Sequence, residues 1–370
     1  MRHLSLLLLA ATLAFGCQSD PAPTSDKAPV TKAAPESGKT GAEAAKTTPE
    51  ASKAAPAAAK SDATSLTVYS GRGAVLVEPL FKQFTEATGI AVEVRYDKST
   101  GALAERLATE GKQSPADVFF AQDSGYLGAL AERGFLQAVP KETLAQADER
   151  FRPQSGKWVP VSGRARVLVY SPERVPAASL PTSLSDLAKP EWKGRMGWAP
   201  SNSSYQAHVS ALRTLWGEEK TRAWLAGVKA NEPTVYPKNS PQVKAVSSGE
   251  IDLGWVNHYY LHKLKASNPD LKASNHSFAK GDAGNLMMLS GAGITVHTKK
   301  TAAAKKLLAF LVSDQAQTYF ATKVYEYPVR SAIARHPDVP PLSEDLVQVK
   351  QAALTDVSGT VALLRSLDLN

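Results

Sequence analysis

Residues 66–96, LTVYSGRGAVLVEPLFKQFTEATGIAVEVRY, decide the fold class of this chain. The stretch begins and ends in short apolar runs, LTVYS and IAVEVRY, which are typical of β-strands. Between them, Gly89 supplies a helix stop. The apolar side chains before it recur at helical spacing, at Val77, Leu80, Phe81 and Phe84. A strand, a helix and a second strand in this order predict a parallel sheet covered by helices.

The same alternation continues through the rest of the folded body. Further strands are expected at 116–121, 164–170, 194–200, 233–237, 251–256 and 291–298, with helices at 102–111 and 126–134, near Ser204, Ser240 and Asn257, and around Leu307. The fold class is therefore α/β. Ligands of open parallel sheets bind beyond the carboxyl ends of the strands. A site is thus expected among the polar loops SGRGA, AQDSG, APSNSSY, YPKNS and VNHYY.

Residues 1–17, MRHLSLLLLAATLAFGC, combine an early positive charge with a short apolar run and indicate an export signal. The apolar run is shorter than the roughly 20 residues that a membrane-spanning helix needs. Ala14-Phe15-Gly16-Cys17 resembles a bacterial lipobox. We therefore expect a lipidated Cys17 and an exported lipoprotein, periplasmic or at the cell surface, anchored to a bacterial membrane. The alternative is a soluble exported protein that is cleaved nearby.

Residues 18–64 contain no Leu, Ile, Met, Phe, Tyr or Trp. Such a segment cannot bury enough apolar area to fold, so we expect a disordered tether rich in Ala, Pro and Lys. Cys17 is the only cysteine, which excludes an intramolecular disulfide and a Cys-based zinc site. The formal net charge of +8 is dispersed and does not indicate a nucleic-acid partner.

The most informative side chains are the adjacent Tyr259 and Tyr260, which follow the expected strand IDLGWV. Neighbouring residues diverge in a regular strand or helix, so the two phenols converge only at an irregular junction. We expect that junction where Asn257 caps the helix HYYLHKLKAS. A highly charged cation stabilises a phenolate far below its ordinary pKa. Three phenolates balance ferric iron, and Tyr205 is a natural third donor; the alternative is that the pair are packing aromatics.

Other motifs for chemistry are weak or missing from the sequence. His258 and His262 are spaced as zinc ligands can be, but they lack the intervening glutamate of HExxH. The chain has no P-loop, no GxSxG motif and no visible set of acid, base and nucleophile. We therefore expect a binding protein and not an enzyme.

The chain resembles the ferric iron-binding extracytoplasmic proteins of bacterial ABC importers from about residue 66 to 330. Beyond the opening stretch, the segments in the family's order are SPADVFFAQDSG, SGRARVLVY, EWKGRMGWAPSNSSYQ, VYPKNS, GEIDLGWVNHYYLHKL and GDAGNLMMLSGAG. The resemblance implies a two-lobed, type II-like periplasmic-binding-protein fold with a ligand cleft between the lobes. It implies a monomer that delivers ferric iron to an inner-membrane ABC permease and its ATPase. Lobe 1 would contain 65–165 and 291–330, and lobe 2 would contain 166–290 and 331–370 with a C-terminal helical tail.

The resemblance also assigns metal ligands. The family's paired tyrosines map onto Tyr259 and Tyr260, and members with a third tyrosine from the second lobe match Tyr205. Many members have a histidine where this chain has Gly73, and some have a glutamate where it has Gln122. The remaining first-lobe candidates are then Tyr69 and the neutral Gln122, or the sphere is completed by water or by a synergistic anion such as carbonate or phosphate.

An anion is expected at the start of the helix near Ser204, because free backbone N–H groups there favour negative charge. The candidates are Asn202, Ser203, Ser204, Asn239, Asn257, Gln122, Arg72 and Arg164. Asn239 and Asn257 match family positions that help to hold the anion. Surface salt bridges of the arginines are an alternative. The competing function is a protein of the same fold for an oxyanion, a polyamine or an organic cofactor.

Overall fold

The computed structural model describes residues 65–97, 99–341, 349, 354 and 356–369 of the chain. These residues belong to one compact unit, Ala59–Asn370. The expected signal at 1–17, with Cys17, and the expected tether at 18–64 lie outside the described residues. In the described ranges, no helix is long and apolar enough to cross a membrane.

The opening stretch folds into a strand, a helix and a strand, as its pattern predicts. β1 (Ser65–Ser70) and β2 (Ala91–Tyr96) pair in parallel, and α1 (Ala74–Thr88) joins them. Gly89 ends α1 in the left-handed conformation, with φ 71°, which glycine adopts without steric cost. The buried face of α1 carries the expected apolar residues, Val77, Leu80, Phe81 and Phe84.

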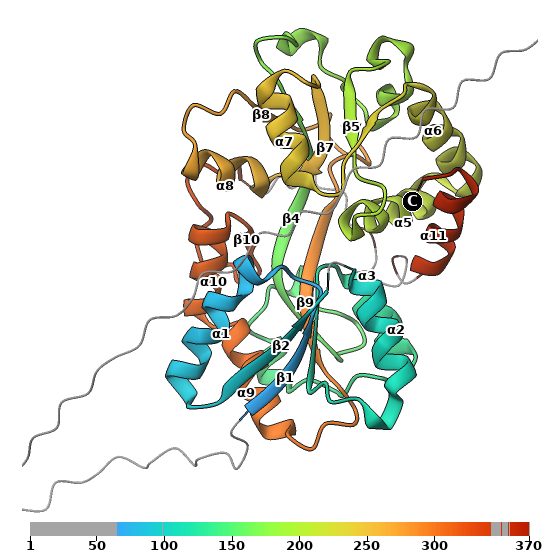
Figure 1. The fold of residues 1–370 in the computed structure, drawn as a ribbon. Coiled ribbons are helices and arrows are strands. Elements are labelled where there is room, and N and C mark those ends of the chain that lie inside the picture. The colour runs from blue at the N-terminus through green and yellow to red at the C-terminus, as the bar shows by residue number, and fades with distance from the viewer. Residues whose placement is uncertain (1–64, 98, 342–348, 350–353, 355, 370) are drawn as a thin grey trace, which may run out of the picture. The chain divides into compact units, whose positions relative to one another are not determined.

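We call the group of elements around β1 lobe 1 (Figure 1). It adds β3 (Val118–Ala121), which pairs in parallel with β1, and the helices α2 (Thr100–Glu110), α3 (Ser124–Glu132), α4 (Lys141–Leu144) and α9 (Thr301–Leu311). Side chains of β1, α1, β3 and α9 share one apolar core. Lobe 1 is therefore completed by a helix from late in the chain.

We call the second group of elements lobe 2. It contains β5 (Met196–Trp198), α5 (Ser203–Trp216), α6 (Glu218–Ala230), β6 (Thr234–Val235), α7 (Asn239–Ser248), β7 (Leu253–Asn257), α8 (Tyr259–Ser267), β8 (Ser274–His276) and α11 (Val357–Ser366). β5 pairs in parallel with both β6 and β7. α11 packs against α5 and places Leu363 and Leu364 in the core of this lobe.

Two strands are shared by the lobes. β4 (Val159–Tyr170) pairs antiparallel with β9 (Met287–Ile294) through Val159–Ala165, and with β7 through Arg166–Tyr170. β9 also pairs antiparallel with β3, so one sheet runs through both lobes in the order β2-β1-β3-β9-β4-β7-β5-β6 (Figure 1). The expected lobe boundary at 165/166 falls where β4 changes partner, and the one at 290/291 falls inside β9.

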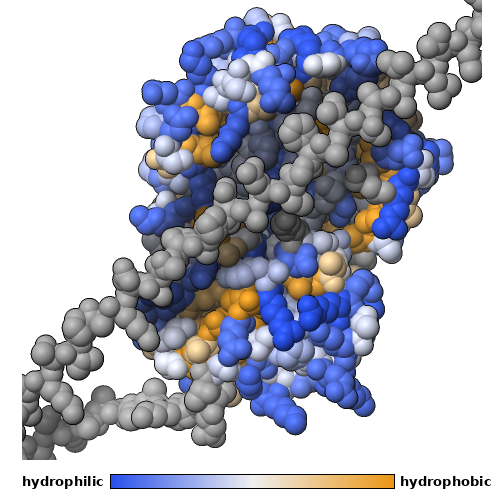
Figure 2. Space-filling model, viewed as in Figure 1, coloured by the Kyte–Doolittle hydropathy of each residue, from blue (hydrophilic) through white to orange (hydrophobic). Residues whose placement is uncertain are grey.

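The chain returns to these shared strands after α9. α10 (Asp314–Tyr319) and a π-helix (Phe320–Val324) lead to β10 (Tyr327–Pro328), which pairs with Gly163 and Ser162 of β4. Residues 325–328 thus lie beside the crossover between the lobes. On the face drawn in Figure 2, hydrophilic residues predominate along the outer margins of the described residues.

Candidate functional site

Tyr205 lies in the first turn of α5, directly after β5 and a short loop. Asn202 caps the helix, because its side-chain oxygen accepts the N–H of Ser204 at 3.1 Å. The backbone N–H of Tyr205 donates to the carbonyl of Asn202 at 2.9 Å. The cap therefore fixes where the Tyr205 side chain leaves the helix.

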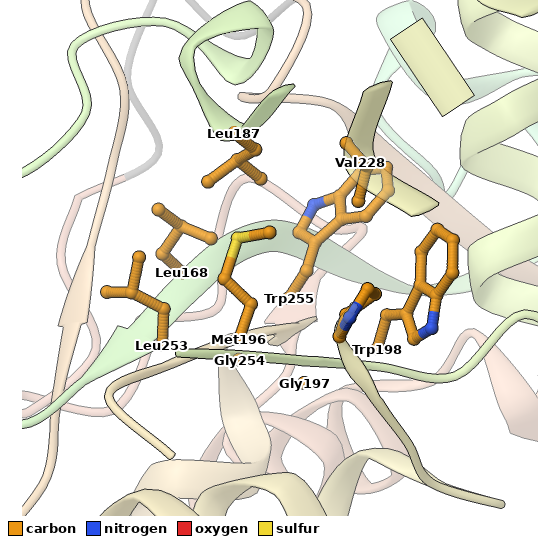
Figure 3. Close-up of a pocket in the computed structure, with 10 residues that line it drawn as sticks. Leu168, Leu187, Met196, Gly197, Trp198, Val228, Leu253, Gly254 and Trp255 are labelled. Carbon is orange, nitrogen blue, oxygen red and sulfur yellow. The ribbon is translucent and has the colours of Figure 1, made fainter. Parts of the chain in front are cut away.

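Two tryptophan rings pack against the ring of Tyr205. The ring packs edge-on against Trp198 and Trp255, with centroids 6.0 and 4.9 Å away. Both tryptophans also line an apolar pocket with Met196 and Leu253 (Figure 3). The Tyr205 hydroxyl is buried and has no hydrogen-bond partner among the described residues. Burial raises the pKa of Tyr205 well above its ordinary value, although the charge of a nearby arginine opposes this.

The junction between β7 and α8 brings Tyr259 and Tyr260 together, but by a different cap from the one expected. Asn257 is the last residue of β7 and pairs with Arg166, while His258 occupies the N-cap position of α8 without a side-chain capping bond. The prediction that Asn257 caps this helix is wrong, because the pairing with β4 keeps it in the strand. The rings of Tyr259 and Tyr260 stack at the junction, with centroids 4.1 Å apart and planes at 29°.

Tyr259 is fully buried, and its hydroxyl has no partner in the part of the chain that the structure describes. Tyr260 is partly exposed. Burial and then the neighbouring Tyr260 raise the pKa of Tyr259 well above its ordinary value. A buried hydroxyl without a hydrogen bond costs free energy. A cation bound to the oxygen would remove this cost and would hold the phenol in its ionised form.

Three fully buried arginines contribute positive charge near the tyrosines. Arg72 lies in the loop between β1 and α1, and Arg164 and Arg166 project from the same face of β4 because they are two residues apart. Arg72 and Arg164 lower the pKa of Tyr259, and Arg166 lowers that of Tyr205, against the larger effect of burial. Burial lowers the pKa of Arg166 to about 9. Arg166 is not among the site residues predicted from the sequence, although the alternation in SGRARVLVY places it on the same strand face as Arg164.

Polar groups of both lobes meet at the hydroxyl of Ser204. This oxygen accepts hydrogen bonds from Gln122 at 2.8 Å and from Arg164 and Asn257 at 3.2 Å. Arg164 also donates to the backbone carbonyl of Gln122. Since Gln122 follows β3 in lobe 1 and Ser204 belongs to lobe 2, this network joins the two lobes.

The network continues through the other expected anion-binding residues. Arg166 Nη1 donates to the side-chain oxygens of Asn257 at 3.0 Å and Asn239 at 3.4 Å, and Asn239 donates to that of Asn202 at 3.4 Å. The hydroxyl of Ser203 is buried and unpartnered within the described ranges. Free backbone N–H groups are expected at this helix start, and one of them, the N–H of Ser204, donates to the Asn202 side chain instead.

Tyr69 does not join the other tyrosines. Its hydroxyl donates to Glu110 of α2 at 2.7 Å and accepts from Arg95 of β2 at 3.1 Å. Because these partners already satisfy the hydroxyl, no unpaired phenol supports a ligand at Tyr69, which stays a prediction from the sequence. Gly73 stands at the N-cap position of α1, and a Cβ built on it would have no atom within 4 Å.

The two histidines near the start of α8 differ in their contacts. Nδ1 of His258 accepts the N–H of Ala165 at 3.1 Å, and its Nε2 lies 2.9 Å from the carbonyl of Tyr325. Burial lowers the pKa of His258 to about 3, which keeps the ring neutral. The ring of His262 stacks on that of Tyr325, and its buried Nε2 has no hydrogen-bond partner among the described residues. No group of three His, Cys, Asp or Glu side chains suited to a metal occurs among the described residues.

Comparisons with known proteins agree on one family. The model of the bacterial extracellular solute-binding proteins matches residues 113–350. The Fe(3+)-binding periplasmic protein of Serratia marcescens is 35% identical over 293 residues, which cover 78% of this chain and 86% of that protein. The structure is similar to that of iron-bound HitA from Pseudomonas aeruginosa, with a TM-score of 0.79, 34% identity and coverage of 82% of this chain and 99% of HitA.

A Trichodesmium protein, IdiA (FutA), in complex with iron and citrate ligands is also similar, with a TM-score of 0.71 and 28% identity over 83% of this chain and 100% of that one. These similarities confirm the expected two-lobed α/β fold class.

Proposed function

This chain belongs to the ferric iron-binding periplasmic proteins within the bacterial extracellular solute-binding family, and we propose that it captures a ferric ion through Tyr205, Tyr259 and Tyr260. The observation that carries the proposal is the pair of buried hydroxyls, on Tyr205 and Tyr259, that have no partner among the described residues. The family transports solutes and is not a family of enzymes.

Charge favours a trivalent cation at these phenols. Burial raises the pKa of Tyr205 and Tyr259, so both phenols are protonated in the iron-free protein at neutral pH. A ferric ion displaces these protons, and three phenolates neutralise its charge. A divalent cation stabilises a phenolate less than a trivalent one does. The three phenols therefore favour a hard trivalent ion.

A small oxyanion, carbonate or phosphate, would complete the site. The supporting observation is the excess of buried cations near the tyrosines, where Arg72, Arg164 and Arg166 outnumber the carboxylates Asp123 and Glu326. The third buried carboxylate of the described residues, Asp117, pairs instead with Lys300. The proposed contacts are the side chains that meet around Ser204, with Asn202, Ser203, Asn239, Asn257 and Gln122. The Trichodesmium protein holds citrate together with iron, so a carboxylate anion is a further candidate.

Delivery would follow from the contacts between the lobes. Gln122 and Arg164 reach Ser204 only when lobe 1 and lobe 2 are close, so ligand that bridges the lobes favours the closed state. An ABC permease that separates the lobes would break these bonds and release iron. We propose a lipid anchor at Cys17 for this exported protein, and Cys17→Ser should then lose membrane association; unchanged fractionation would contradict the anchor.

The visible spectrum tests the metal assignment. Iron-loaded protein should show a phenolate-to-iron charge-transfer band, and the double variant Tyr259→Phe with Tyr260→Phe should lose both the band and the affinity. Tyr69→Phe is the matched control, because its hydroxyl is already bonded to Glu110, and it should keep the band. Retained colour in the double variant would refute the assignment.

A further inference from the structure

Glu326 is a buried carboxylate at the crossover between the lobes, outside every expected site. Its side chain is fully buried, and its Oε1 accepts from Nη2 of Arg72 at 2.7 Å. Its Oε2 accepts from the hydroxyl of Ser162 on β4, which lies 2.7 Å from the hydroxyl of Ser290 on β9. The carboxylate therefore connects Arg72 of lobe 1 to both shared strands.

This ion pair uses only part of the Arg72 guanidinium. Nε and Nη1 are buried and have no partner among the described residues. The backbone is fixed as well, because the N–H of Arg72 donates to Ser70 Oγ at 3.2 Å and that hydroxyl donates to the Arg72 carbonyl at 3.1 Å. The charge of Arg72 lowers the pKa of Tyr259, and Tyr260 in turn raises the pKa of Arg72. A fixed cation with free donors thus lies near the tyrosine pair.

We propose that Glu326 is a positioning residue of the iron site, which holds Arg72 so that its Nε and Nη1 groups donate to the anion bound with ferric iron. This inference rests on the proposed function. Gly73 offers no donor and Gln122 is neutral, so lobe 1 supplies a cation here in place of an anionic ligand. Such a cation binds the oxyanion and not the metal. The cargo that closes the lobes is then a ferric ion already paired with an oxyanion.

The residues beside Glu326 tie the same segment to the tyrosines. The carbonyl of Tyr325 lies 2.9 Å from Nε2 of His258, which precedes the tyrosine pair, and Tyr327 pairs with Gly163 of β4. Three consecutive residues thus contact the start of α8, Arg72 and a shared strand. Glu326 sets the position of Arg72 relative to the phenols of lobe 2.

Ferric affinity with and without an added oxyanion tests this role. In wild type, bicarbonate should raise the affinity. Glu326→Gln should cut that enhancement by roughly tenfold or more, because a charge-assisted contact is lost, and should keep the charge-transfer band. Arg72→Met should reduce the enhancement by a similar factor. The variant with both substitutions should show the same enhancement as Arg72→Met alone, since Glu326 and Arg72 act through one guanidinium.

The control is Asp252→Asn, which also removes a carboxylate that pairs with an arginine, at 2.7 Å from Arg174, and should leave the enhancement unchanged. If Glu326→Gln does not fold, Ser162→Ala loosens the same carboxylate and should lower the enhancement in the same direction. An enhancement equal to wild type in a folded Glu326 variant would overturn the inference alone. A wild type without the charge-transfer band would overturn the proposed function instead.

Discussion

Replacement of Tyr259 by phenylalanine should stabilise the iron-free protein while it removes an iron ligand. The Tyr259 side chain is 0% exposed, and its hydroxyl has no partner among the described residues. Leaving such a group unpaired costs about 1–3 kcal/mol. Phenylalanine keeps the ring that stacks on Tyr260 at 4.1 Å, so little packing is lost. We therefore expect the free energy of unfolding of the iron-free variant to rise by about 1 kcal/mol, or roughly 2 °C in Tm.

Urea unfolding of chelator-treated protein measures this change as a higher midpoint at an unchanged slope. Tyr236→Phe is the control, because its hydroxyl donates to Glu250 at 2.7 Å and its removal should lower stability by about 1 kcal/mol. With ferric iron the order should reverse, since wild type keeps all three proposed phenol ligands and gains more stability from binding. If the iron-free Tyr259→Phe protein is less stable than iron-free wild type, the hydroxyl must have a hydrogen-bond partner in wild type. The reasoning from an unpaired phenol would then fail.

Three further outcomes follow from the site. Because burial raises the pKa of Tyr205 and Tyr259, iron must displace their protons. Ferric affinity should therefore fall roughly tenfold for each unit decrease in pH and each proton displaced. An acid titration of the charge-transfer band that shows the same affinity at every pH would contradict this. Iron should quench the fluorescence of Trp255, whose ring lies 4.9 Å from that of Tyr205; Trp255→Phe should remove more of the quenching than Trp158→Phe in the core of lobe 1, and equal losses would argue against Tyr205. Gly73→His should raise ferric affinity in a competition assay and reduce its need for an anion, since open space surrounds that position, and an unchanged affinity would place it away from the metal.

Local patterns predicted most of the elements because the apolar residues of each strand or helix recur with the period of that element. The alternation around β1 and α1 is an example. β4 was expected only at 164–170, but it begins at Val159. Its first residues include Pro160 and Gly163, which are uncommon in strands. Side chains on both faces of this part of β4 are buried, so apolar and polar residues do not alternate there.

The site was partly predictable for a related reason. Tyr205 and Asn239 follow the carboxyl ends of strands, where the rules of parallel sheets bring loops together. The Asn257 cap failed because strand pairing with β4, a distant contact, outweighed a local preference. The partners of Tyr69 and Arg72 are Glu110 and Glu326, which are far along the chain from them. Single-sequence patterns carry no information about such pairs.

The sharing of β9 between the lobes has a consequence for how the protein is made. β3 ends up hydrogen-bonded to β9, with Val118 opposite Ile294, and α9 supplies Leu307 and Leu308 to the core of lobe 1. A nascent or translocating chain cannot close lobe 1 until these late residues have emerged. During export the amino-terminal lobe therefore waits, with exposed strand edges, for the carboxyl-terminal third of its own chain, and this interval is where chaperones and proteases would act.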